Sequence, residues 1–501
     1  MAFSPRSSLL LAAALSVIAV ASAQAQEAPP ASGAVAVTTL APPDLFSTPA
    51  AETGLPGDLW KDASPELMRQ ILPSLAAKPL SPAFAELARR VLATGAHAPK
   101  GVGDDPAMGG ARALALVALG EAAGAKQVLD RTPGLDQNAA LAMAAAEANL
   151  IRGDDERACA IADALSVDRG AGYWLRLRAF CQQRAGQLDQ AQLTFNLAQQ
   201  QGKDPAYARL MTALLAKTPA TGTGDLSSGI NFALSTTLAL EIRTPAAAAT
   251  ASPALRPVIA PAPTDVAAAQ ASDWAFLRTA RPGADYAAAA RAAAPLIAAA
   301  AGAGGPIDQA LFLRAALAAG DVKTAQAIRG GMTADTIPGV GPQDLALFDA
   351  ALAAASGGST DQALDRLVEL GAAGGPKSPA QPAAVVLQAL GGALSPEDRA
   401  TFAGFEAGKS TASAARLALL DSAAAAGRKG EAALLALSVA TEAGVAGPSA
   451  GDRARIVSAL NRAGLAADAR AIAVEGLLPA PPAPPKAAAP KPAAKPAAKK
   501  K

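Results

Sequence analysis

The chain has 501 residues, of which 51% are hydrophobic but only 3% are aromatic, and its formal net charge is +2. It contains one histidine and two cysteines. These counts argue against a Ser-His-Asp triad, a histidine-rich metal site and most other chemistry that uses imidazole. We therefore expect no catalytic, cofactor-binding or metal-binding residues, and a protein that is not an enzyme.

The N-terminus has the three parts of a secretory signal peptide. Arg6 precedes the uncharged apolar run LLLAAALSVIAVA, and the small residues Ala23 and Ala25 follow it. The run is shorter than the ~20 apolar residues that a membrane-spanning helix needs. We therefore expect residues 1–25 to be a signal peptide that is cleaved near Ala25. The mature chain is expected in a bacterial periplasm, without a transmembrane segment.

The body of the chain has the composition of a helical protein. Residues 26–55 are rich in proline, alanine and threonine, and are expected to form a disordered linker. Beyond them alanine and leucine dominate, and alanine is the strongest helix former. The stretches SPELMRQILPSLA and SPAFAELARRVLAT, which begin at Ser64 and Ser81, are predicted to be the first pair of helices.

A short pattern, a glycine followed five residues later by an alanine, recurs along the chain. Each glycine follows a helical stretch, and each alanine lies inside the next one. The first three glycines are spaced at intervals of 33 residues. The glycines of the pattern are Gly120, Gly153, Gly186, Gly320, Gly358, Gly427 and Gly464. Because glycine tolerates the left-handed conformation that ends a helix, the pattern predicts antiparallel helical hairpins that stack into a solenoid.

One repeat resembles the tetratricopeptide family. In GQLDQAQLTFNLAQQQGKDP, the residues Gly186, Ala191, Phe195 and Ala198 have the spacing of the small and aromatic positions in that family's second helix. The other repeats keep only the glycine and alanine positions. Residues 55–217 are also similar to uncharacterised exported, alanine-rich helical proteins of Gram-negative bacteria. The resemblance implies an all-α, tetratricopeptide-like solenoid and carries no known activity with it.

Two interruptions divide the helical pattern. TPATGTGDLSSG follows Lys217, and a proline-rich stretch extends to residue 264. We therefore expect a first helical-hairpin lobe over residues 56–217, an irregular connection over 218–264 and a second lobe over 265–478.

The two cysteines, Cys159 and Cys181, are predicted to form a structural disulfide. Each lies 11 residues from Gly170, near the turn between two predicted antiparallel helices, so the two sulfurs are expected at the same height. An oxidising compartment favours such a bond. A redox pair would usually be Cys-x-x-Cys, and zinc needs four ligands, so these alternatives are weaker. Tyr173 and Trp174 are expected to pack around the bond.

Two other features suggest chemistry that we do not expect. His97 lies in a loop flanked by glycine and proline, and is expected to be a solvated side chain. Gly408, Lys409 and Ser410 resemble the end of a phosphate-binding loop. However, three residues separate Gly404 from Gly408, where that motif requires four.

The C-terminal segment 479–501 is a tail of lysine, alanine and proline without acidic residues. Its six lysines are Lys486, Lys491, Lys495, Lys499, Lys500 and Lys501. Removing these six charges and that of Arg6 from +2 leaves −5 for the rest of the chain. The tail is predicted to be extended and disordered, and to make loose contacts with anions of the cell wall or membrane surface. A tail that only increases solubility is an equal alternative.

A solenoid of helical hairpins typically binds peptides or other proteins. We therefore expect an exported interaction scaffold or adaptor of the cell envelope, with unknown envelope proteins as partners and no nucleic acid. A cell-wall glycan hydrolase with a pair of carboxylates and a purely structural wall protein are the alternatives.

Overall fold

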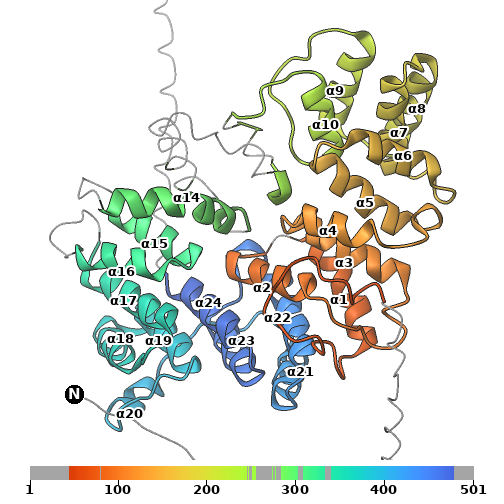
Figure 1. Cartoon of the computed structure of the whole chain (residues 1–501). Helices are drawn as coiled ribbons and strands as arrows, with labels where there is room; N and C mark the ends of the chain where they lie inside the picture. The colour runs from red at the N-terminus through yellow and green to blue at the C-terminus, as the bar shows by residue number, and fades with distance from the viewer. Residues whose placement is uncertain are drawn as a thin grey trace, which may run out of the picture. The chain divides into compact units, whose positions relative to one another are not determined.

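The computed structural model describes residues 44–78, 80–244, 246–247, 251–255, 274, 277, 284–302, 308–332 and 340–478. Over these residues the chain folds into 21 α-helices and four short 3-10 helices, without a strand (Figure 1). The expected all-α fold class is therefore confirmed. The predicted signal peptide and the lysine tail lie outside the described residues.

The first group of helices comprises α1 (Pro65–Ala77), α2 (Pro82–Ala93), α3 (Pro106–Ala118), α4 (Ala122–Leu129), α5 (Ala139–Ile151), α6 (Asp155–Ala164), α7 (Gly172–Arg184), α8 (Leu188–Gln201), α9 (Pro205–Ala216) and α10 (Gly229–Thr237). The second group comprises α14 (Ala284–Gly302), α15 (Gln309–Ala319), α16 (Val322–Gly330), α17 (Pro342–Ser356), α18 (Asp361–Gly374), α19 (Ala380–Ala389), α20 (Asp398–Phe402), α21 (Ala414–Ala425), α22 (Lys429–Ala443), α23 (Ala450–Arg462) and α24 (Ala466–Leu477). The 3-10 helices are η1 (Leu135–Gln137), η2 (Pro253–Leu255), η3 (Gly375–Lys377) and η4 (Gly444–Ala446). None of the described helices has the length and apolar character needed to cross a bilayer.

Several helices begin with a capping residue followed by proline. The side chains of Ser64, Asp105 and Asp204 each accept a hydrogen bond from a backbone amide in the first turn of α1, α3 and α9. Proline fits the first position of a helix because its missing N–H would have no partner there. The two predicted N-terminal helices are thus present as α1 and α2, called the N-terminal hairpin below.

Six of the seven repeat glycines have a positive φ and lie at the end of a helix. They are Gly120, Gly153, Gly186, Gly320, Gly427 and Gly464. The alanine five residues after each is completely buried in the next helix; these are Ala125, Ala158, Ala191, Ala325, Ala432 and Ala469. The glycine thus allows the chain to turn, and the small alanine lets the second helix approach the first.

The remaining repeat glycine is corrected by one position. Helix α17 ends at Ser356, and Gly357, with φ 71°, takes the left-handed conformation that was predicted for Gly358. Two consecutive glycines follow the helix, and the first of them is the cap. The equal spacing that supports the earlier repeats is absent here.

Helices α5 to α10 share one hydrophobic core. Trp174, Phe180 and Tyr207 are its large buried side chains, and alanines of α5 fill the space between them. In this region each helix contacts the next, as in a row of hairpins, and α7 and α8 lie side by side (Figure 1).

A second core joins the two ends of the described chain. It contains Phe46 and Trp60 together with α1 to α3, and it continues through α14 to α24. The N-terminal hairpin contacts α14, α22 and α24, although 190 residues lie between it and the nearest of them. The core therefore does not divide into the two expected lobes, because helices from both of these lobes pack into it.

Two predicted segment boundaries also differ from the structure. Residues 44–55 were expected to belong to a disordered linker, but Phe46 is fully buried and the Ala50 amide donates to the Ala93 carbonyl. The expected irregular connection over 218–264 contains α10, whose residues Ile230 and Leu234 are buried. In both places the polar or proline-rich composition concealed a few apolar residues that pack into a core.

Candidate functional site

The disulfide joins two neighbouring hairpins. Cys159 on α6 and Cys181 on α7 are bonded, with their Cα atoms 5.5 Å apart, so neither cysteine of the chain is free. The expected pairing is therefore present. Trp174 is buried in the same core, and its ring meets the ring of Tyr173 edge to face at 5.0 Å. The bond fixes α6 against α7, and the packed aromatic rings support a structural role for it.

A carboxyl group close to this region docks α10 onto α5. Glu147 of α5 accepts a 2.9 Å hydrogen bond at Oε2 from the amide of Gly229, the first residue of α10. A Cβ atom at Gly229 would lie 2.8 Å from that oxygen, so this contact requires glycine. Burial raises the pKa of Glu147, although the Gly229 amide and the Tyr173 hydroxyl partly oppose the shift. The group is a buried helix cap.

We expect the variant Glu147→Gln to be more stable than the wild type at pH 7. The glutamine oxygen can still accept from Gly229, and the cost of burying a charge is removed. Because the pKa of Glu147 is raised in the folded state, the protonated carboxyl favours folding. This contribution to stability is fully present below pH 4.5 and is lost as pH rises through the folded-state pKa. The advantage of the variant should therefore shrink as pH falls towards 4.5. Thermal unfolding at several pH values measures this, with Glu156→Gln at an exposed position as the control. A variant less stable than the wild type at pH 7 would contradict the assignment.

Two carboxylates from the C-terminal helices cap the N-terminal hairpin. Glu475 of α24 accepts from the Ser81 hydroxyl and the Ala83 amide, both at 2.6 Å, at the start of α2. Glu431 of α22 accepts from the amide of Ser64, the cap of α1, at 2.7 Å. A carboxylate at the N-terminus of a helix satisfies free amides and interacts favourably with the helix dipole. The first turn of each helix of the hairpin is therefore capped by a carboxylate from the C-terminal end of the described chain.

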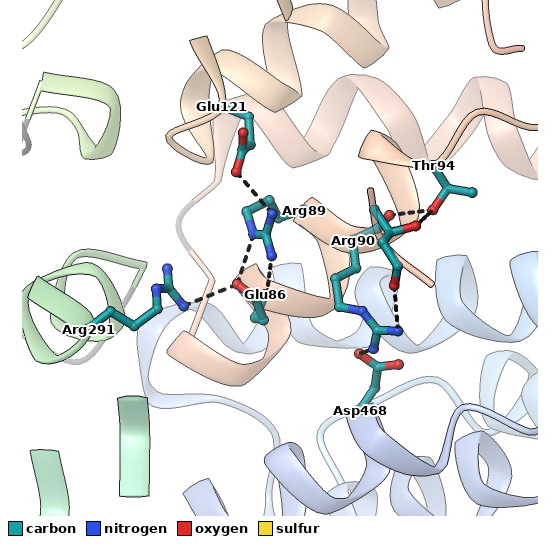
Figure 2. Close-up of polar contacts among 8 residues, drawn as sticks. Glu86, Arg89, Arg90, Thr94, Glu121, Arg291 and Asp468 are labelled. Carbon is teal, nitrogen blue, oxygen red and sulfur yellow. Dashed lines mark hydrogen bonds and ion pairs between the residues drawn. The ribbon is translucent and has the colours of Figure 1, made fainter. Parts of the chain in front are cut away.

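A cluster of charges on α2 extends this contact (Figure 2). Glu86 bonds to Arg89 and lies 3.2 Å from Nη1 of Arg291 on α14, and Arg89 reaches Glu121 at 3.0 Å. Burial alone would raise the pKa of Glu86, but Arg89 and the other nearby arginines hold it below its ordinary value. One carboxylate thus links α2 to α14, and one guanidinium links α2 to the start of α4.

A second pair lies beside this cluster, one helical turn along α2 from Glu86. Arg90 donates a 2.6 Å hydrogen bond to Asp468 of α24 (Figure 2). It also donates a 3.3 Å bond to the carbonyl of Thr53. The Asp468 side chain is only 4% exposed, and burial raises its pKa against the effect of Arg90. The charged groups of α2 therefore contact other charged groups of the fold, and they hold helices together.

Arg112 is the most enclosed guanidinium of this region. The residue is 1% exposed, and it donates hydrogen bonds of 2.8–3.3 Å to the carbonyls of Leu92, Leu45, Thr48 and Thr94. Burial lowers its pKa to about 10. The side chain thus holds segment 44–48 against the C-terminal end of α2. Nothing in the local sequence around Arg112 indicates this role.

The loop that resembles a phosphate-binding loop already holds an anion of the protein itself. Asp452 of α23 accepts from the Ser410 hydroxyl at 2.5 Å and from the Thr411 amide at 3.0 Å, and the Ser449 hydroxyl also donates to it. Burial would raise the pKa of Asp452, but these hydrogen bonds lower it. The donors that could have held a phosphate are therefore used to hold α23 beside the start of α21.

A polar cavity of about 320 Å³ lies where the ends of several helices meet. Its lining includes Gly357, Thr360, Asp361, Asn461 and Arg470. The Asp361 carboxylate accepts from the Ala393 amide at 2.8 Å. Asp361 supplies the carboxylate among the residues that line this cavity.

The remaining predicted features are His97, the expected absence of a metal site and the lysines of the tail. The His97 side chain is 61% exposed, with Nδ1 3.5 Å from a carboxylate oxygen of Asp44. The described residues contain no group of three or more side chains able to hold a metal ion. The lysines of the tail, Lys486, Lys491, Lys495, Lys499, Lys500 and Lys501, lie outside the described residues.

Comparison with known proteins adds no identification. No protein-family model, no curated protein and no solved structure matches the chain.

Proposed function

We propose that this protein is an exported scaffold of tetratricopeptide-like hairpins that binds other proteins of the cell envelope. The observation that carries the proposal is the row of helices α5 to α10, in which Gly153 and Gly186 are left-handed and the alanine five residues after each is buried. Stacked hairpins of this kind offer extended surfaces that suit the binding of proteins or peptides. The charged clusters on α2 and at Asp452 support the same view, because their groups are engaged in holding helices together.

Two features support export. The first is the signal-like sequence of residues 1–25, and the second is the disulfide, a bond that persists in oxidising compartments. The lysine tail would then meet anions of the wall or membrane surface. Expression of the full chain with a C-terminal affinity tag tests this part, since the mature protein should begin at Gln26 in the periplasmic fraction. Recovery of the uncleaved chain in the cytoplasm would contradict it.

The scaffold and the hydrolase are separated by two assays on the same purified protein. A scaffold should release no soluble fragments from isolated cell wall, and it should be recovered with one stoichiometric envelope protein after cross-linking in cells. Turnover of cell wall that survives deletion of residues 479–501 would favour the hydrolase. Recovery without any stoichiometric partner would favour the purely structural wall protein.

A further inference from the structure

The outer face of α8 combines exposed leucines with amide side chains. Leu193 is 62% exposed and Leu197 is 42% exposed, while Phe195 and Ala198 on the opposite side pack into the core. The exposed residues of this side, called the α8 face below, are Asp189, Gln192, Leu193, Asn196, Leu197 and Gln200.

The α8 face differs from an ordinary solvent-facing helix surface. An amphipathic helix usually presents charged residues to water, whereas the 14 residues of α8 include a single charge, at Asp189. Leu193 and Leu197 are four residues apart, so they form one apolar patch on consecutive turns. Exposed apolar patches with a polar rim are typical of protein interfaces.

We propose that the α8 face binds the α8 face of a second copy of this chain, with the two helices antiparallel about a twofold axis. If the axis crosses the face at the level of residue 195, Leu193 of each copy lies opposite Leu197 of the other. Within the face the Gln192 amide donates to Asn196 Oδ1 at 3.2 Å. The remaining donors and acceptors of Gln192, Asn196 and Gln200 can pair with the same groups of a second copy. An isologous contact of this kind is the commonest form of protein dimer.

The charges at the two ends of the face agree with the same register. Asp189 lies opposite residue 201 of the second copy, two positions from Lys203. Both Asp189 and Lys203 are exposed, and neither takes part in an ion pair with the described residues of its own chain. An antiparallel pair would therefore place opposite charges near each other at both ends, whereas a parallel pair would place like charges together.

The contact should be weak, because one pair of 14-residue helices buries less than the roughly 1,600 Å² of a standard stable interface. We expect the mature wild-type chain to form dimers with a dissociation constant in the range of about 1–100 µM, measured by sedimentation equilibrium. The double variant Leu193→Glu/Leu197→Glu should weaken the association at least about tenfold, because four carboxylates would then meet at one apolar patch. Leu419→Glu is the matched control, since Leu419 is 50% exposed on α21 and should not affect the association.

A charge exchange tests the register independently. Lys203→Asp should weaken the association, since it places like charges at each end, and Asp189→Lys/Lys203→Asp should restore it. Equal thermal unfolding of all variants at low concentration shows that each is folded. A wild-type chain that stays monomeric up to about 100 µM would overturn the proposal. A dimer that tolerates Leu193→Glu/Leu197→Glu would also overturn it, because the two copies would then meet elsewhere. Neither result would affect the proposal that the protein is a scaffold, which concerns other partners.

Discussion

Replacement of Arg112 by methionine is expected to lower the free energy of unfolding by about 3–5 kcal/mol. Methionine can fill much of the volume but donates no hydrogen bond. The carbonyls of Leu92, Leu45, Thr48 and Thr94 would lose a donor together, and two of these bonds lie fully inside the protein. Urea unfolding followed by circular dichroism measures the change.

Two further variants show whether the loss belongs to this site. Arg112→Lys keeps the charge but has fewer donors in a different geometry, so its loss of stability should be smaller than that of Arg112→Met. Arg157→Met removes an exposed guanidinium from α6 and should change stability by less than about 0.5 kcal/mol. If Arg112→Met behaved like Arg157→Met, the contact between segment 44–48 and the end of α2 would not contribute to folding.

Removal of the disulfide is the second large effect that we expect. The variant Cys159→Ser/Cys181→Ser should be about 3 kcal/mol less stable than the oxidised wild type, because the bond closes a loop of 22 residues in the unfolded chain. The loss should appear as earlier unfolding of α5 to α10, which share the core beside the bond.

Treatment with a reductant separates the effect of losing the S–S bond from the effect of the serine side chains. Dithiothreitol should destabilise the wild type and have no effect on the double serine variant. An oxidised wild type with the stability of the double variant would show that the bond adds nothing to the fold. Hydrogen exchange should locate the change, with faster exchange in α6 and α7 and little change in α23 and α24.

The local parts of the fold were accessible from the sequence. The stretches that begin at Ser64 and Ser81 were predicted as the first two helices, and α1 and α2 are found there. The disulfide followed from two cysteines at equal distances from one turn, a relation that depends on neighbouring helices alone. The six repeat glycines with a positive φ were found for the same reason, since a helix end is determined within a few residues.

The contacts between distant segments were not accessible in this way. Glu475 and Ser81 are 394 positions apart, and no spacing rule in a single sequence relates them. The expected two lobes failed at this point, because the N-terminal hairpin has its partners among the last helices of the chain. Buried polar groups are a similar case. The environment of Arg112 arises from three segments that meet only in the folded chain.

The central claim is that this chain works by holding other envelope proteins. The most direct test is cross-linking in living cells of the native host, followed by capture of the tagged full chain and identification of what is covalently attached. Our account predicts one envelope protein, other than the chain itself, at a fixed ratio to it, and reciprocal capture when that protein carries the tag. Capture of the chain alone, or of many proteins in proportion to their abundance, would contradict the account.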